Sequence, residues 1–588
     1  MAKVAEYAVF GALMALNFGL GLYFSLRRKA RSADTTAEVF LGSRALRSFP
    51  LAASVVASLV SSTGLVGFTG HFYAYGFHLM WNGLNTIAVA PLVACLFLPV
   101  FYALRITSVF EYIRLRFNSA ISLTACASYL FLTQSIGALS IYAASLTIVT
   151  IFGAPLIWCN IVIGVGGTLY TALGGLRGVV WTDCMQLVFI LLGPTTVIAK
   201  IIVDSASSTG ASQALHELDL RTYAANVAFD ITHDENVWSA FVASTTASIY
   251  RVGLDQVVVQ RCMASRTLGS AQRTVLMGSV MLVAVYAINL AVTMALIVWF
   301  WGCDPKLSGA IQSYDQILPY YVKAFLVHIP GFTGLFLAAV VSAATSTISS
   351  IINSQAAVLY VDVLSPHFKN VNSHVKWITR GTAFLLGAIM TLYSCACVYM
   401  GSITRVILMV LSASTGPFVG LLLLAIAFPF VHTKGAGIST LLLLGFQLLV
   451  MWQAIYSGAK PPLMPVTLDY CPENSTHLQN SSNFTTLPPI ERSHDASDSF
   501  QLSAFWSCLF STCGTVVLGV LISVATGEHK MRKAEVAHVN KWFAHLWRKL
   551  GFVEYDIKEL NGDKEKDYDL TTAALLLNGD AHKPETTI

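Results

Sequence analysis

The chain has 588 residues, of which 55% are hydrophobic and only 11% are charged. A soluble globular protein carries roughly 25% charged residues, so the composition argues against a soluble chain. The net charge of +5 identifies no partner, and no nucleic-acid-binding feature, nucleophile–base pair, phosphate-binding loop or metal-ligand cluster stands out in the apolar regions, which favours transport over catalysis.

Long stretches without charge predict an all-α membrane protein. No Asp, Glu, Lys or Arg lies between Arg47 and Arg105, or between Arg116 and Arg177. Each stretch can hold two spans of about 20 apolar residues. Hydropathy predicts about thirteen spans, near residues 4–26, 50–74, 79–103, 120–148, 155–173, 184–203, 236–259, 274–300, 329–361, 380–400, 403–430, 436–456 and 503–526.

Basic residues orient these spans, because short cytoplasmic loops carry an excess of Lys and Arg. One set of alternate loops holds 17 Lys and Arg, and the other set holds 6. The richer set comprises residues 27–48, 104–118, 174–183, 260–273, 362–380 and 431–435, and the poorer set comprises 204–235, 301–328, 401–405 and 457–502. The chain is therefore predicted in the plasma membrane, with its N-terminus outside and its C-terminus in the cytoplasm.

The polar loop 457–502 supports this orientation without using charge. It contains three Asn-X-Ser/Thr sequons, at Asn474, Asn480 and Asn483. N-glycans are added on the lumenal side of the membrane, so the loop is predicted to be extracellular and glycosylated.

The order of spans predicts an inverted repeat flanked by additional helices. Residues 1–48 form a leading helix and a cytoplasmic loop, 49–203 hold five spans, and 236–430 hold five more. An odd number of spans per block gives the two blocks opposite topology. Residues 431–526 add two helices with the loop 457–502 between them, and 527–588 form a cytoplasmic tail.

The first span of each block contains residues that could interrupt a helix. The first has Ser61-Ser62-Thr63-Gly64, and the second has Ser244-Thr245-Thr246 and Gly253. Unwound backbone inside a membrane is tolerated where it faces protein or a water-filled cavity, so matching interruptions predict a binding site. Alternatively, the glycines only permit close helix packing.

The span 329–361 is rich in hydroxyl groups. The nine residues Ser342–Ser350 include six Ser or Thr, and Ser342, Ser346, Ser349 and Asn353 recur at helical spacing on one face. Neutral oxygen atoms suit a hard cation such as Na+. The alternative is that these hydroxyls bond to their own helix or to a neighbour.

Several motifs in order resemble the sodium/solute symporter family over roughly residues 1–530. They are Leu98–Tyr102, Thr107–Tyr112 with Leu115–Asn118, Tyr170–Arg177 with Trp181–Asp183, Val259–Arg261 and Pro330–Phe336. Within that family, the chain looks most similar to the branch that contains the monocarboxylate, multivitamin and iodide transporters.

The resemblance implies a LeuT-type 5+5 inverted repeat preceded by one extra helix, with Na+ as the coupling ion and no other cofactor. It also implies a sodium site whose ligands are the backbone oxygens of Ala57, Val60 and Ala343 and the hydroxyls of Ser346 and Thr347. Asp183 matches an acidic residue that the family uses along its sodium route. Alternatively, Asp183 is a structural partner for a loop arginine such as Arg177.

The substrate side departs from that branch. Gly64 stands where iodide carriers have a glutamine, Gly67–His71 replaces the branch's usual turn, and Asp255-Gln256 stands where Asn-Gln is usual. His71 and His78 are expected near the outer membrane interface rather than in a proton relay.

Arg251 is an unexpected charge inside an apolar span, and an intramembrane charge is a functional candidate by default. If the span is a regular helix, Arg251 and Asp255 share one face and could form an internal ion pair. Alternatively, Arg251 snorkels toward the cytoplasm, or its planar fork binds a substrate carboxylate.

Two further features concern the loops and the tail. Cys303 and Cys471 both fall in predicted outer loops and could form a disulfide or remain free. The chain ends in Thr586-Thr587-Ile588, which fits the commonest PDZ ligand class, although a tail without a partner is the alternative.

The sequence as a whole predicts a sodium-coupled symporter that takes up a small organic anion, such as a monocarboxylate or a vitamin carboxylate, by alternating access. The alternatives are uptake of an inorganic anion such as iodide, and a sensor or channel-like member that keeps the fold without coupled transport.

Overall fold

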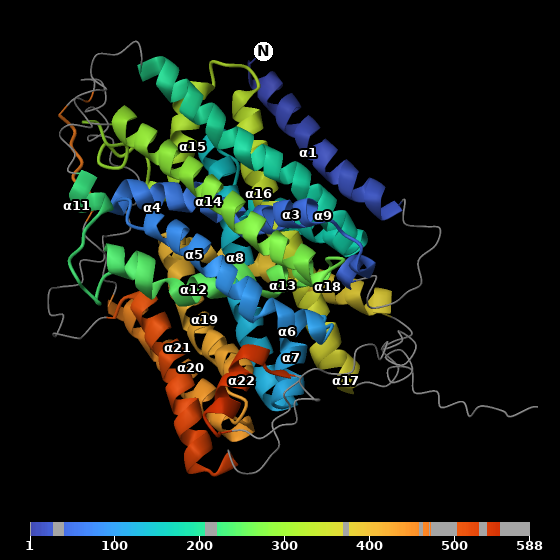
Figure 1. Ribbon diagram of the computed structural model, residues 1–588. Helices are drawn as coiled ribbons and strands as arrows, with labels where there is room; N and C mark the ends of the chain where they lie inside the picture. Colours follow the sequence, from blue (N-terminus) through green and yellow to red (C-terminus); the bar gives the residue numbers. More distant parts are fainter. Residues whose placement is uncertain are drawn as a thin grey trace, which may run out of the picture.

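The computed structural model describes residues 2–26, 40–205, 220–300, 302–367, 375–457, 463–469, 471, 502–528 and 538–552. The elements within these ranges are helical (Figure 1). Ten helices there are long and apolar enough to cross a membrane, and an eleventh span is obtained if one bent pair is counted. The expected glycosylation sites and the PDZ-like terminus lie outside the described residues.

The long helices agree with the hydropathy prediction to within a few residues at most ends. They are α1 (Ala2–Leu26), α5 (Met80–Leu96) continued by α6 (Leu98–Ala103), α8 (Ser119–Phe152), α9 (Leu156–Ser205), α14 (Leu268–Trp299), α16 (Phe332–Val358), α18 (Val375–Ala396), α19 (Ile403–Ala427), α20 (Thr433–Ser457) and α21 (Ala504–Ala525). Shorter helices lie between them, among them α7 (Val109–Arg116), α11 (Leu220–Ala224), α15 (Ile317–Tyr321), α17 (Ser365–His367) and α22 (Lys541–Lys549).

Side-chain caps and glycines fix the ends of these helices. Asn118 accepts the N–H of Ile121 at 2.9 Å to start α8, and α8 ends at Gly153, whose φ of 72° is accessible to glycine without steric cost. Thr267 likewise caps α14 by accepting the N–H of Ser270. The apolar run therefore sets where each helix lies, and the polar flanking residues set where it stops.

Both predicted interruptions are present. The first span divides into α3 (Ser48–Leu59), the π-helix η3 (Thr63–Gly67) and α4 (Phe68–Tyr75), with a bend of 62° between the two parts. The second divides into four short pieces: η4 (Ser239–Ala243), α12 (Thr245–Ile249), η5 (Tyr250–Leu254) and α13 (Gln256–Met263). None of those pieces is long enough to span a membrane alone, which is one reason why fewer than thirteen spans are recognised by length.

The prediction of a loop at residues 174–183 was wrong, because the backbone stays helical throughout α9. α9 must nevertheless bend sharply. A Cβ at Gly21 would lie 3.4 Å from the ring of Tyr170 and 3.6 Å from the methyl of Thr182. A straight helix would separate two positions twelve residues apart by about 18 Å. The segments before and after the predicted loop therefore both pack against α1, and Asp183 lies in a helix.

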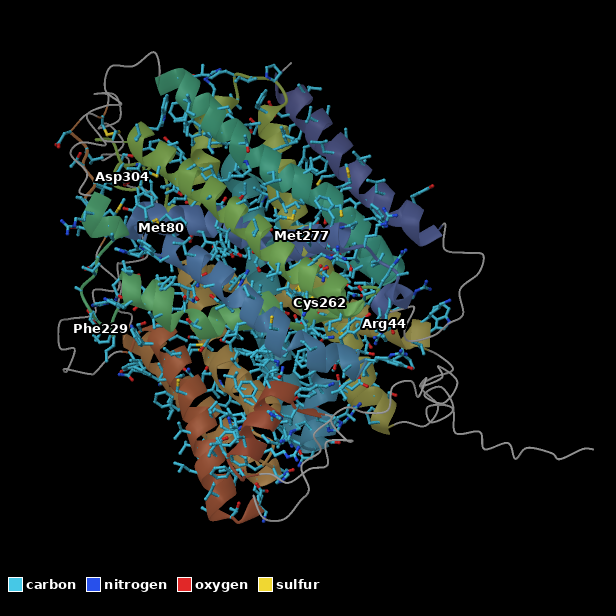
Figure 2. All side chains as sticks on the ribbon, in the orientation of Figure 1. Arg44, Met80, Phe229, Cys262, Met277 and Asp304 are labelled. Atoms are coloured by element: carbon cyan, nitrogen blue, oxygen red, sulfur yellow. A yellow bond between two sulfur atoms is a disulfide. The ribbon has the colours of Figure 1, made fainter. Side chains whose placement is uncertain are left out.

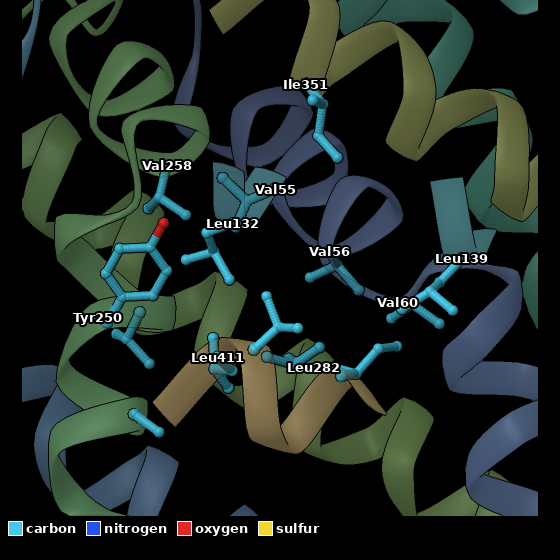
Figure 3. Packing of buried hydrophobic residues seen from close by; sticks show 14 of the residues in the cluster. Val55, Val56, Val60, Leu132, Leu139, Tyr250, Val258, Leu282, Ile351 and Leu411 are labelled. Carbon is cyan, nitrogen blue, oxygen red and sulfur yellow. The ribbon is translucent and has the colours of Figure 1, made fainter. Parts of the chain in front are cut away.

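Helix α16 lies at the centre of the molecule. In its most apolar stretch, 94% of the residues are buried inside the protein. Figure 1 shows α1 along one flank and α20 with α21 along the opposite flank. In the core, Val56 and Val60 of the first broken span pack among Leu139, Leu282 and Leu411 from three other helices (Figure 3).

Labelled residues from two predicted outer loops lie apart from a labelled residue of a predicted inner loop. Figure 2 shows Phe229 and Asp304, from two predicted outer loops, on one side, and Arg44, from a predicted inner loop, on the other. Cys303 and Cys471 form a disulfide, which joins two predicted outer loops 168 residues apart in sequence. The disulfide therefore brings two of the predicted outer loops together.

Candidate functional site

Hydroxyl groups of α16 meet the carbonyl end of α3 in the buried centre of the protein. Ser346 Oγ lies 2.8 Å from Ala57 O and 3.0 Å from Ala343 O. Thr347 Oγ1 lies 3.0 Å from Ser58 O and 3.1 Å from Ala343 O. All five residues are at most 5% exposed. The structure thus brings four of the five predicted sodium ligands together and adds the carbonyl of Ser58.

The local sequence explains why these carbonyls are available. The last carbonyls of a helix lack the backbone donors of a following turn, and α3 ends at Leu59. Ser61 then adopts a φ of 25°, an unusual conformation for a residue with a side chain. Val60, the remaining predicted ligand, is the C-cap residue and is fully buried. The helix break therefore exposes backbone oxygens to α16.

The chemistry of this cluster fits Na+. Its atoms are hydroxyl and carbonyl oxygens, which hard cations prefer. The cluster itself contains no formal charge, so a monovalent cation would be solvated by dipoles alone. In the structure each hydroxyl donates to a carbonyl, and rotation of the hydroxyl hydrogen would turn both oxygens toward a bound cation.

Asp183 belongs to a buried network on the neighbouring side of α3. Arg261 Nη2 donates to Asp183 Oδ2 at 3.0 Å, and the two side chains are 1% and 0% exposed. Ser54 Oγ also donates to Asp183 Oδ2. Arg261 makes further hydrogen bonds with the hydroxyls of Ser54, Ser58 and Ser350 and the carbonyl of Val257.

The ion-pair partner of Asp183 is Arg261, which falls in the predicted inner loop 260–273 but lies in α13 in the structure. The side chain of Arg177 lies outside the described structure. The network is also continuous with the cation cluster, since Ser58 contributes its carbonyl to Thr347 and its hydroxyl to Ser350. Ser58 therefore contacts both the buried ion pair, through its hydroxyl, and the candidate sodium site, through its carbonyl.

A cavity of about 160 Å³ lies among α4, α5, α12, η5, α14 and α19. Most of its lining is apolar or aromatic, including Phe68, Phe72 and Tyr286. Its polar side chains are those of Asn82, Thr86, Ser248, Arg251, Tyr286 and Asn289. Arg251 is the one lining residue with a formal charge, so the cavity combines a single cation with largely apolar walls.

Arg251 does not pair with Asp255. Its Nη2 donates to the carbonyl of Leu59 at 2.7 Å, and its buried Nε has no hydrogen-bond partner. Asp255 instead accepts the N–H of Val257 at 2.9 Å and caps α13. The expectation of a shared helical face was wrong, because Arg251 lies in the π-helix η5 and Asp255 has extended backbone.

The other substrate candidates do not line this cavity. The carbonyl of Gly64 accepts a hydrogen bond from Asn289, which does line the cavity, at 2.9 Å. The amide of Gln256 donates to Thr107 O and accepts from the N–H of Val109, so it holds the connection between α6 and α7. His71 lines a different cavity.

This second cavity, of about 210 Å³, lies between α4, α19, α20, α21 and the loop before η4. His71, Glu235 and Arg405 are among its lining residues, and Leu408 belongs to both cavities. Burial, helped by the neighbouring Asp234, raises the pKa of Glu235 to about 7. In the predicted orientation, this second cavity lies on the extracellular side of the cavity that contains Arg251.

Sequence reasoning missed Arg261, Ser58 and the polar cavity residues Asn82, Ser248 and Asn289. Arg261 carries a usable signal, because it is a charge that adjoins an apolar span and belongs to the Val259–Arg261 motif. The others are ordinary polar residues in helices whose partners lie more than 150 residues away in sequence. Only the tertiary packing distinguishes them.

Comparison with known proteins agrees with this architecture. The family model described as the sodium:solute symporter family matches residues 39–443. The chain is 30% identical to mouse sodium-coupled monocarboxylate transporter 2, over 89% of this chain and 84% of the relative. It is also 30% identical to the human sodium/iodide cotransporter, with the same coverage of 89% and 84%.

A solved structure of a Na+-coupled sialic acid symporter, in a substrate-bound outward-open state, has the same fold. It superimposes with a TM-score of 0.71 at 21% sequence identity and covers 89% of this chain and 98% of its own. At this identity the likeness concerns the arrangement of helices alone.

Proposed function

This chain belongs to the sodium:solute symporter family, and on that premise we propose that it couples the movement of Na+ to the uptake of a small organic anion. Membership makes the chain a sodium-coupled transporter rather than an enzyme, with Na+ as its coupling ion. The observation that supports an organic anion is the position of Arg251, the one charged residue lining a largely apolar cavity.

We propose that Na+ binds between α3 and α16. Its ligands are the carbonyls of Ala57, Val60 and Ala343 and the hydroxyls of Ser346 and Thr347. The hydrogen bonds of Ser346 to Ala57 and of Thr347 to Ala343 support this. A cation between these oxygen atoms would replace each hydrogen bond with two contacts to the ion. Bound Na+ would fix the end of α3 against α16.

The cavity suits a carboxylate attached to an apolar body. Arg251 has N–H groups to spare after its bond to Leu59, and guanidinium pairs well with a carboxylate because two parallel hydrogen bonds can form. The walls that contain Phe68, Phe72 and Tyr286 would cover the remainder of the ligand. Similarity to sodium-coupled monocarboxylate transporters supports the same substrate class.

The transport cycle is proposed to be alternating access on two inverted five-helix repeats, 49–203 and 236–430, within a chain of thirteen spans. Each repeat begins with an interrupted helix, as such repeats commonly do at their binding sites. Na+ would leave past Asp183, which requires the ion pair with Arg261 to open. That pair would thereby serve as a barrier on the cytoplasmic side.

An inorganic anion is the second candidate, because a single cation in an apolar cavity could also hold a weakly hydrated ion and one relative is a sodium/iodide cotransporter. The three aromatic rings favour the organic anion, since a monatomic ion would leave that surface uncovered.

The proposal is tested by radiolabelled uptake in Na+ medium and in choline medium, with lactate, pyruvate, nicotinate, biotin, pantothenate and iodide. Uptake of a carboxylate that needs Na+ is the expected result, and uptake of iodide alone would favour the second candidate. Ser346→Ala and Thr347→Ala should each raise the half-saturating Na+ concentration, since losing one buried oxygen ligand costs about 1–3 kcal/mol. Thr382→Ala is the control, because that hydroxyl bonds only within α18.

A further inference from the structure

Three consecutive carbonyls at the end of α3 accept hydrogen bonds from side chains. Those of Ala57 and Ser58 accept from Ser346 and Thr347, the hydroxyls of the candidate sodium site. The third carbonyl, that of Leu59, accepts from Arg251 at 2.7 Å. One short piece of backbone therefore touches the sodium site on one side and the cation of the substrate cavity on the other.

We infer that Arg251 is the residue that couples sodium binding to substrate binding, because its guanidinium joins the carbonyl of Leu59 to the anion in the cavity. The inference rests on the proposed function, since it needs a carboxylate as the ligand of Arg251. The Nε of Arg251 is buried and without a hydrogen-bond partner, so a donor is available to the anion while Nη2 stays on Leu59.

The direction of the coupling follows from these contacts. Na+ would hold the carbonyls of Ala57 and Val60, which positions Leu59 and so presents Arg251 to the cavity. A carboxylate on Arg251 would in turn hold Leu59 and reduce the freedom of the preceding carbonyls. Each ligand should therefore strengthen the binding of the other by the same factor, as linkage requires. In this scheme Arg251 is also a positioning residue for the sodium site, which it does not touch.

The first experiment uses Na+ as the only ligand. The melting temperature of the purified full-length protein in detergent is titrated with NaCl at constant ionic strength, with choline as the replacement cation. Arg251→Met should raise the half-saturating Na+ concentration by roughly five-fold or more, the lower end of typical coupling between sites. Arg266→Met is the matched control, because Arg266 also donates to a backbone carbonyl, that of Ala45, but on a loop. Equal Na+ titrations for wild-type and Arg251→Met would overturn the inference.

The second experiment uses the best-transported carboxylate of the uptake series. In the wild type, raising Na+ should lower the KM for that carboxylate by roughly five-fold or more. Arg251→Lys keeps the charge but lacks the planar guanidinium that would donate to the carbonyl of Leu59 and to the carboxylate at the same time. The KM of this variant for the carboxylate should therefore be nearly independent of the Na+ concentration. Asn82→Ala should raise the KM and leave its dependence on Na+ intact.

The outcomes separate the inference from the proposed function. If Arg251→Lys retains the full dependence of KM on Na+, the coupling role is wrong even though transport is confirmed. If no carboxylate is transported, the proposed function fails, and the Na+ titration still decides whether Arg251 supports the sodium site. If Arg251→Met does not fold, Arg251→Lys takes its place in that titration, with the same direction expected.

Discussion

Removing the positive partner of Asp183 should destabilise the protein strongly. Arg261 makes five hydrogen bonds, to Ser54, Ser58, Asp183, Val257 and Ser350. Arg261→Met would leave the Asp183 carboxylate buried without its counter-charge, and its second oxygen already lacks a partner. Breaking a buried ion pair from one side costs about 3–5 kcal/mol, so we expect a loss of that size.

The double variant distinguishes an ion pair from two independent contributions. Asp183→Asn should cost less than Arg261→Met, since Arg261 keeps four uncharged partners. Combining the two changes should recover roughly 2–3 kcal/mol relative to the sum of the single losses, because no buried charge is then stranded. Unfolding by SDS in mixed micelles measures each free energy.

A second ion pair gives the control. Lys200 and Asp204 are each 23% exposed, so Lys200→Met should change stability by less than about 1 kcal/mol. If the losses of Arg261→Met and Asp183→Asn simply add in the double variant, the two side chains do not stabilise each other. The interpretation of the network as an ion-paired barrier would then be wrong.

Three features outside the membrane core give further tests. Deglycosylation should increase the gel mobility of the protein, and changing Asn474, Asn480 and Asn483 to Gln should abolish that shift; an unshifted wild type would contradict glycosylation of the loop. Burial lowers the pKa of His78 from 6.5 to about 4, so the unfolded state binds the proton more readily than the folded state. The melting temperature should therefore fall as the pH is lowered from 6.5 to about 4. His78→Gln should flatten the fall, and an unchanged slope would assign it to another group. A peptide of the last ten residues should bind PDZ domains in a pull-down, whereas Ile588→Ala should not; binding that ignores the terminal residue would contradict the prediction.

The sequence was sufficient for features that depend on local composition. Hydropathy located the long apolar helices, and serine and glycine clusters located both interrupted helices. The hydroxyl-rich run Ser342–Ser350 pointed to the candidate sodium site, although the carbonyls of Ala57, Val60 and Ala343 were predicted from a family resemblance. The structure brings that run and Ala57 together because α3 ends where α16 passes it.

Features that depend on distant partners could not be predicted. Arg251 and Asp255 are four residues apart, which favours a pair on a regular helix, but the π-turns of η5 and the extended backbone at Asp255 separate their roles. The partner of Arg251 is instead Leu59, 192 residues earlier in the chain. The partner of Asp183 is likewise distant, because Arg261 lies 78 residues later in the chain, in α13.

The break after Leu59 gives the end of α3 three different contacts. The carbonyl of Ser58 faces Thr347, its hydroxyl faces Ser350 and Arg261, and the next carbonyl faces Arg251. In an unbroken helix those two carbonyls would also accept backbone N–H groups of the following turn, so each would have less acceptor capacity for a donor from another helix. The interruption therefore does more than free ligands for one ion. It places contacts to the candidate sodium site, to the buried ion pair and to the cation of the candidate substrate cavity on adjacent residues, so that a displacement of this one helix end would change all three together.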